Sequence, residues 1–356
     1  MLFNGALGFM LFAGARHLNL RDLRNHALPV LALATVGVVL ATGFYGVAVL
    51  FVFRLVGATV PLIWCLVLGA SMAPTDPIAV GGLLRSAGLP PDLLAVITGE
   101  SLFNDGAAVV LFTVLLGIAT GTHAGGAITP VGLSVLFLRA ILGGALLGFA
   151  GGSLGSLAIT LIDDYDLEIT ISLVVVSTIY VAALRIGASA PIAVVVAGIV
   201  IGNHQRGRSM SVATRANVTL FWSLVDQLLN TLLFLLMGLE LLTIDTRHFW
   251  PGLIALASLL ALLARFVSVA LAALLVRSRR LLPLRALTVL TWCGLRGGVS
   301  VALALSLPSV AARAPLLEAC YGVAVFTIVV QGLTVPSLIR RLYGVRPGAG
   351  AGAGAE

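Results

Sequence analysis

Apolar stretches run through almost the whole chain, and short polar loops separate them. A helix needs roughly 20 residues to cross about 30 Å of hydrocarbon, and most of the stretches have that length. The pattern therefore predicts an all-α polytopic membrane protein with eleven segments, of which 131–162 is long enough to be tilted or bent. The segments are residues 2–18, 29–53, 58–84, 93–119, 131–162, 169–184, 191–202, 218–242, 253–276, 286–307 and 316–342.

Composition favours a bilayer location for the whole folded part. Of the 356 residues, 60% are hydrophobic and 10% are charged, and the mean hydropathy is +1.12. A soluble domain of this size does not need so apolar a chain. We expect one transmembrane domain over residues 1–345 and a flexible Gly/Ala tail over 346–356, with neither a signal peptide nor a soluble domain.

The charges indicate orientation rather than a polyanionic partner. The formal net charge is +7, but the basic residues are spread through loops and the chain has no lysine, which argues against a nucleic-acid surface. If the C-terminus is cytoplasmic, fourteen arginines fall in inside loops and ends and four fall outside. This bias predicts a multi-pass protein of a cell (inner or plasma) membrane with a cytoplasmic C-terminus.

Cysteine and histidine offer no obvious metal or redox centre. Cys65, Cys293 and Cys320 lie in apolar segments without paired spacing, and the five histidines fall in loops or at segment ends. A nucleotide-binding loop of the G-x-x-x-x-G-K-[ST] type requires a lysine, and this chain has none. We therefore expect no cofactor and no enzymatic activity.

A small set of ionisable residues falls inside the apolar segments. Each costs roughly 2.5 to 3.5 kcal/mol at the bilayer centre, so each should have a partner, a water-filled cavity or a task. The set comprises Asp76, Glu100, Asp105, Arg139, Asp226, Arg265, Arg296 and, nearer a segment end, Glu240.

The segment 58–84 contains "GASMAPTDPIAV" and should break in its middle. Pro74 and Pro77 lack an N–H and so free the carbonyls four residues earlier from helical bonding. A break at this depth is tolerated where it lines a cavity or is packed in protein, and it exposes carbonyl oxygens and half-helix ends beside Asp76. Hard oxygen ligands suit an alkali cation. A proline kink with a capping aspartate is the simpler alternative.

The segment 93–119 contains "GESLFNDGAAVVLF". Ser101 and Asp105 are four residues apart and share one helix face, while Glu100 and Asn104 share the adjacent face. Such residues could also form a polar seam between helices, but a seam needs no carboxylates.

Other intramembrane charges suggest partners for these carboxylates. Arg296 lies in "TWCGLRGGVSVALAL", and we expect its planar guanidinium to pair with Glu100. Asp226 and Asn230 are four residues apart and could line the same cavity or lie at the membrane interface. Arg139 and Arg265 should pair or reach lipid head groups.

Six motifs in chain order resemble the NhaP/NHE branch of the monovalent cation:proton antiporters. They are "LGFMLFAGARHLNLRDLR", "APTDPIAV", "GESLFNDGAAVVLF", "LNTLLFLLMGLEL", "GLRGGVSVALAL" and "VQGLTVPSLIRRL". The resemblance implies an inverted-repeat fold of thirteen helices, usually homodimeric, with two interrupted, crossing helices. Segments 58–84 and 286–307 look like that pair.

The resemblance also assigns roles to residues of this chain. Asp105 would bind either a cation or a proton, assisted by Asp76, with further oxygens from Thr75 and Ser101. Glu100, Asn104 and Arg296 would form a structural network beside the site. Because residue 104 is Asn rather than a second Asp, the resemblance implies electroneutral exchange of Na⁺ (or K⁺ or Li⁺) for H⁺.

The chain departs from the family pattern in two ways. Asn19 stands where relatives often carry an acid, so only a weaker cavity-lining role is expected there. Eleven segments stand against the usual thirteen, which predicts two further apolar stretches encoded in frame upstream of Met1, or else a truncated, non-transporting paralogue. Other interpretations are a potassium-selective or channel-like relative and, with less support, an intramembrane aspartyl protease.

Overall fold

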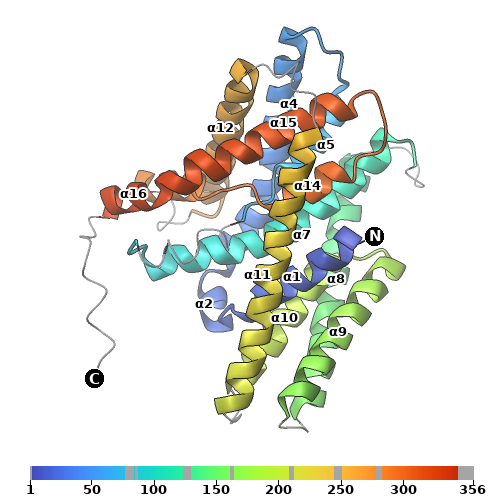
Figure 1. The fold of residues 1–356 in the computed structure, drawn as a ribbon, viewed down its shortest axis with the longest axis vertical. Coiled ribbons are helices and arrows are strands. Elements are labelled where there is room, and N and C mark those ends of the chain that lie inside the picture. Colours follow the sequence, from blue (N-terminus) through green and yellow to red (C-terminus); the bar gives the residue numbers. More distant parts are fainter. Residues whose placement is uncertain are drawn as a thin grey trace. The chain divides into compact units, whose positions relative to one another are not determined.

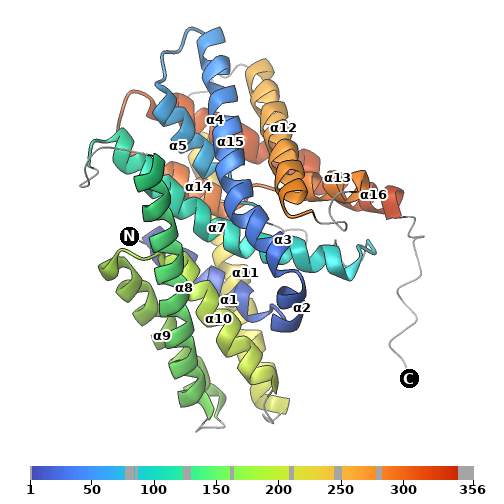
Figure 2. The same ribbon diagram turned by 180° about the vertical axis from the view of Figure 1, so that it is seen from behind.

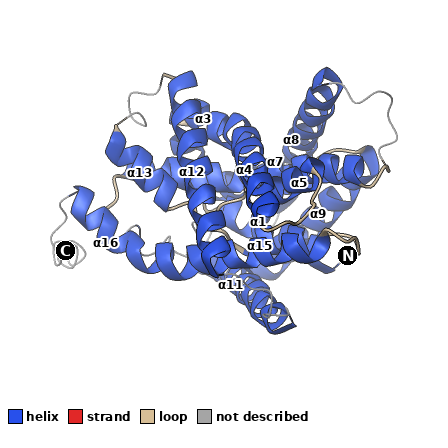
Figure 3. Cartoon of the chain, turned by 90° about the horizontal axis from the view of Figure 1, so that it is seen from above, coloured by secondary structure: helices blue, strands red, loops and turns tan. Residues whose placement is uncertain are grey.

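In the computed structural model, the described residues are 2–76, 84, 87–122, 130–160, 164–207, 212–243, 251–277 and 283–343. Every regular element within these ranges is a helix (Figure 3). Seven of the described helices are long and apolar enough to cross a membrane, and three shorter apolar helices accompany them. The predicted all-α membrane architecture is therefore confirmed.

The chain forms two compact units. Unit 1 consists of Met1–Arg24 and Asp105–Leu242, and unit 2 consists of Asn25–Asn104 and Thr243–Glu356. The boundary falls inside helix α7 (Pro91–Ala119), which contributes Pro91 to Asn104 to unit 2 and the residues from Asp105 onward to unit 1.

Unit 1 is built on close contacts between helix backbones. Its other helices are α1 (Leu2–Arg16), α2 (Leu20–Asn25), α8 (Pro130–Thr160), α9 (Tyr165–Ile186), α10 (Ala190–Gly207) and α11 (Val212–Thr243) (Figure 1). Gly144, Gly148 and Gly152 follow one face of α8 at four-residue spacing, and each lies against the backbone of α10 or of the residue just before it. Helices in lipid associate through such small residues because apolar burial alone gives little driving force there.

Unit 2 contains the predicted breaks. Its helices are α3 (Ala27–Ala32), η1 (Leu33–Gly37), α4 (Val38–Leu55), α5 (Leu62–Ser71), α12 (Pro251–Leu275), α13 (Leu284–Trp292), α14 (Gly298–Leu305), α15 (Arg313–Phe326), η3 (Thr327–Gln331) and α16 (Gly332–Tyr343) (Figure 2). Helices α3, η1 and α4 form one continuous rod, as do α15, η3 and α16. The elements η1 and η3 are π-helical turns within these rods.

The second expected interruption lies wholly within the described residues, whereas the first begins within them and its continuation, residues 77–83, lies outside them. Helix α5 ends at Ser71, and residues 72–76 are not helical. The segment predicted at 286–307 is divided into α13 and α14 by the non-helical residues 293–297. The break after α5 follows from Pro74, whose ring and missing N–H prevent a helix from continuing.

Candidate functional site

The two interruptions of unit 2 bond directly to one another. The backbone N–H of Asp76 donates to the carbonyl of Leu295 at 2.8 Å. In the other direction, Nη1 of Arg296 donates to the carbonyls of Ala73 and Pro74 at 3.1 and 3.0 Å. The Ala73 carbonyl is one of the two that the prolines were expected to free. A backbone carbonyl buried in the membrane needs a donor, and Arg296 supplies it.

The expected pairing of Arg296 with Glu100 is wrong, because Arg265 of α12 takes that place. Nη1 and Nη2 of Arg265 donate to Oε1 and Oε2 of Glu100 at 2.6 and 2.7 Å. Both side chains are buried, with 6% and 1% exposed. This is the bidentate geometry in which a guanidinium binds a carboxylate most strongly. Arg296 is directed to the broken backbone instead.

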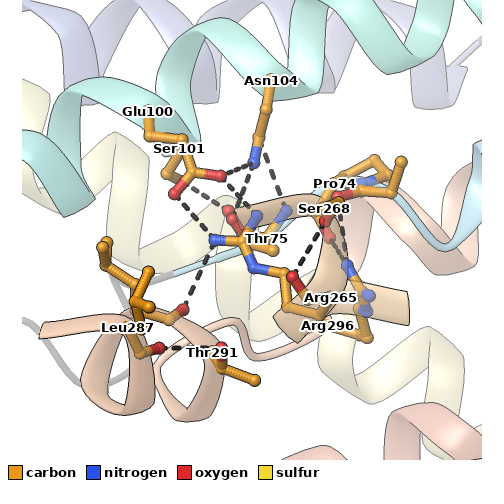
Figure 4. A network of polar contacts seen from close by, with 12 residues as sticks. Pro74, Thr75, Glu100, Ser101, Asn104, Arg265, Ser268, Leu287, Thr291 and Arg296 are labelled. Carbon is orange, nitrogen blue, oxygen red and sulfur yellow. Dashed lines mark hydrogen bonds and ion pairs between the residues drawn. The ribbon is translucent and has the colours of Figure 1, made fainter. Parts of the chain in front are cut away.

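Glu100 belongs to a network that holds the first break against α7 (Figure 4). Nδ2 of Asn104 donates to Oε1 of Glu100 at 3.2 Å and to Oγ1 of Thr75 at 2.7 Å. The hydroxyl of Ser101 donates to the carbonyl of Thr75. Thr75 is therefore attached to α7 through both its side chain and its backbone, and Arg265 holds the carboxylate that orients Asn104.

Asp76 lies where the second break ends and α14 begins. Its side chain is buried, and a Cβ on Gly297 would lie 2.5 Å from its Oδ2 atom. Gly297 is the N-cap of α14, so the Asp76 carboxylate lies at the positive end of that helix dipole. Only glycine allows so close an approach between a backbone and this carboxylate.

For the cation/proton exchange that the motifs imply, we expect Gly297→Ala to lower the rate by at least about tenfold, because the new methyl group would overlap the Asp76 carboxylate and displace the start of α14. Gly43→Ala in α4 is the matched control, since a Cβ there meets nothing within 4 Å. Initial exchange rates per reconstituted protein, measured for both variants, check this expectation. Equal rates in the two variants would contradict the close approach at Gly297.

Asp105 is also buried, with 5% exposed, and lies in unit 1. The next residue, Gly106, lies against α10, where an added Cβ would come within 2.5 Å of Ile192. The glycine of the Asn-Asp-Gly sequence thus allows α7 to pack closely on α10 beside Asp105. Ser101 precedes Asp105 by four residues on the same helix.

The remaining candidates belong to unit 1. Asn19 is exposed, and its Oδ1 accepts from the N–H of Arg21 at 3.0 Å at the start of α2. Asp226 is half-buried and Asn230 is buried, both on α11 of unit 1, and their cavity-lining role stays a prediction. Arg139 is exposed on α8, as a side chain reaching lipid head groups would be. The side chain of Glu240 lies outside the described residues.

Residues 1–341 match the family model described as "Sodium/hydrogen exchanger, transmembrane". The chain belongs to the sodium/hydrogen exchanger family. It is 44% identical over 344 residues to the Na(+)/H(+) antiporter NhaP of Pseudomonas aeruginosa, with 95% of this chain and 80% of that protein covered. It is 39% identical over 315 residues to the Na(+)/H(+) antiporter NhaH of Halobacillus dabanensis, with 88% and 76% covered.

The fold agrees with a solved structure of this kind, the sodium proton antiporter MjNhaP1 from Methanocaldococcus jannaschii at pH 8. The TM-score is 0.80 at 17% sequence identity, and the match covers 96% of this chain and 85% of that one. At this identity the likeness concerns the fold alone. It confirms the antiporter fold that the motifs predicted for this exchanger-family chain.

Sequence reasoning missed three contributors to the site. Arg265 was expected to pair or to reach lipid, but its partner was not identified. Thr327 and Gln331 were not singled out, although both are buried polar residues four apart in an apolar helix. Polar residues at helical spacing inside an apolar segment are a recognisable signal of a bonded partner.

Proposed function

We propose that this chain is a secondary active antiporter that exchanges Na⁺ for H⁺ across a cell membrane, with Asp105 as the exchanging carboxylate and Asp76 as its assistant. The observation that carries the proposal is the pair of broken helices bonded to one another at Asp76 and Leu295, inside a chain of the sodium/hydrogen exchanger family. Half-helix ends and unwound carbonyls at membrane depth are suited to alkali cations.

The mechanism follows from competition for one negative charge. A carboxylate that holds either a proton or a cation, but not both, enforces exchange when the site faces each side in turn. Thr75 and Ser101 would supply further oxygens. No ATP is needed, because the gradient of one ion drives the other.

The fixed charges beside the site support electroneutral exchange. Glu100 is bonded to Arg265, and residue 104 is a neutral Asn whose amide is engaged by Glu100 and Thr75. Asp105 is then the carboxylate of this helix stretch left for transport, and one proton would leave for each cation bound. We further propose a homodimer in an inner or plasma membrane with a cytoplasmic C-terminus.

The test is proton movement in everted membrane vesicles that contain the chain. After respiration has acidified the lumen, addition of Na⁺ should relieve the quenching of a pH-sensitive dye, and parallel additions of Li⁺ and K⁺ rank the cations. A response to K⁺ alone would favour a potassium-selective relative. Cation flux that does not depend on the proton gradient would indicate a channel. The absence of a response to any cation would contradict transport.

We expect Asp76→Asn to lower the apparent affinity for Na⁺ by about tenfold or more, because it removes a negative charge but keeps the volume of the side chain. The neutral amide also interacts more weakly with the N-terminus of α14. The same dye assay over a range of Na⁺ concentrations measures this effect. An unchanged half-saturating Na⁺ concentration would contradict a role for Asp76 in cation binding.

A further inference from the structure

The break between α13 and α14 interrupts the backbone bonding of the helix, and two side chains of the last rod bond to both groups of one of the lost hydrogen bonds. In a continuous helix the N–H of Arg296 would donate to the carbonyl of Trp292, four residues earlier. Here the N–H of Arg296 donates to Oγ1 of Thr327 at 3.2 Å. The carbonyl of Trp292 accepts from Nε2 of Gln331 at 3.0 Å. Thr327 and Gln331 thus replace the two halves of one lost bond.

The position, burial and hydrogen bonds of Thr327 and Gln331 suit them to that role. They begin and end the π-helical turn η3, and both are buried, with 3% and 0% exposed. The Thr327 hydroxyl donates to the carbonyl of Ala324 at 2.9 Å, which leaves its oxygen to accept from Arg296. The N–H of Gly332 donates to the carbonyl of Thr327, five residues back, as a π-helical turn requires. Such turns recur at functional sites.

Thr327 and Gln331, here called the clamp, hold two backbone groups that lie beside the contacts of Asp76 in the chain. Leu295, whose carbonyl accepts from the N–H of Asp76, lies between Trp292 and Arg296. Gly297, which lies against the Asp76 carboxylate, follows directly. Any shift of the two clamped groups therefore moves the backbone that faces Asp76.

We propose that Thr327 and Gln331 are positioning residues for cation exchange, which hold the second break at the geometry that Asp76 requires. This inference rests on the proposed antiport. Neither residue needs to touch the cation, since each acts through the backbone of residues 292–297. Loss of either side-chain partner leaves a buried backbone group without its bond, and the break relaxes toward another geometry.

Two variants remove one half of the clamp each while keeping similar volume. They are Thr327→Val and Gln331→Met. The conservative variant Thr327→Ser keeps the hydroxyl. The matched control is Thr334→Val, because the Thr334 hydroxyl lies on the same rod and accepts from Nε1 of Trp292, not from the backbone of the break.

The first readout is the Na⁺ dependence of exchange in proteoliposomes, per reconstituted protein, at several pH values. Thr327→Val and Gln331→Met should each raise the half-saturating Na⁺ concentration by about tenfold. Thr327→Ser should restore it, and Thr334→Val should leave it unchanged. A loss of protein yield with unchanged half-saturation and pH profile would overturn the proposal, because it would show a purely structural role.

The second readout is amide hydrogen exchange over residues 293–298, which does not depend on transport. Both clamp variants should exchange there about tenfold faster than the unmodified chain, while Thr334→Val should not. If the unmodified chain moves no Na⁺, the antiport fails but amide exchange still tests the clamp. Unchanged protection in both clamp variants would overturn it. Because the two variants act on opposite halves of the lost bond, either one alone tests the clamp if the other does not fold.

Discussion

Asp105→Asn is expected to abolish cation-coupled proton movement and leave the protein folded. The substitution removes the group that we propose holds either a proton or a cation, and it preserves the volume of a side chain that is 5% exposed. A neutral amide can neither titrate nor compensate the charge of a bound Na⁺. We expect exchange to fall to the level of vesicles without the protein.

The control is Asp92→Asn on the same helix. The Asp92 side chain is 59% exposed and pairs with His26 at 3.4 Å, outside the buried network. Dye dequenching should vanish in the Asp105 variant and persist in the Asp92 variant, with both proteins present at equal amounts in the membrane. Persistent Na⁺-dependent dequenching in Asp105→Asn would refute the assignment.

Arg265→Ala is expected to have the largest effect on stability. It leaves the Glu100 carboxylate buried without its guanidinium partner, and breaking a buried ion pair in this way costs about 3 to 5 kcal/mol. Asn104 would then lose the fixed acceptor that orients its amide toward Thr75. We expect a lower melting temperature in detergent and less protein in the membrane.

The double variant identifies the partner. Glu100→Gln removes the stranded charge, so Arg265→Ala with Glu100→Gln should recover much of the lost stability. Arg296→Ala should not be rescued by Glu100→Gln, because Arg296 bonds to the carbonyls of Ala73 and Pro74. Arg139→Ala, at an exposed position, should melt like the unmodified chain. Rescue of Arg296→Ala instead of Arg265→Ala would contradict the pairing.

The first break could be predicted from local chemistry, but the ion-pair partner of Glu100 could not. Pro74 acts on its own helix, so its effect can be read from nearby residues. Arg265 and Arg296 both lie well inside apolar segments, and spacing alone indicates their depth but not their direction. The guanidinium of Arg296 is taken up by carbonyls that come near only because the two breaks meet.

Helix ends were less predictable than membrane segments. The pattern located the segment at 218–242, but α11 begins at Val212 because the helix continues beyond the apolar stretch through Thr214, Arg215 and Asn217. Hydropathy identifies residues that can lie in hydrocarbon, while capping and tertiary contacts decide where a helix ends. The π-helical turn η3 was likewise not predicted; its first and last residues bond to the second break, which is distant in the sequence.

Proton release on Na⁺ binding tests the central claim most directly. Purified protein in weakly buffered detergent, with no membrane gradient, should release about one proton for each Na⁺ bound at a pH below that at which the empty site titrates, where the carboxylate is protonated before Na⁺ binds. The apparent affinity for Na⁺ should rise as the pH increases, because fewer protons compete for the carboxylate. Asp105→Asn should release none. Stoichiometric Na⁺ binding without proton release, at every pH, would contradict exchange at a shared carboxylate.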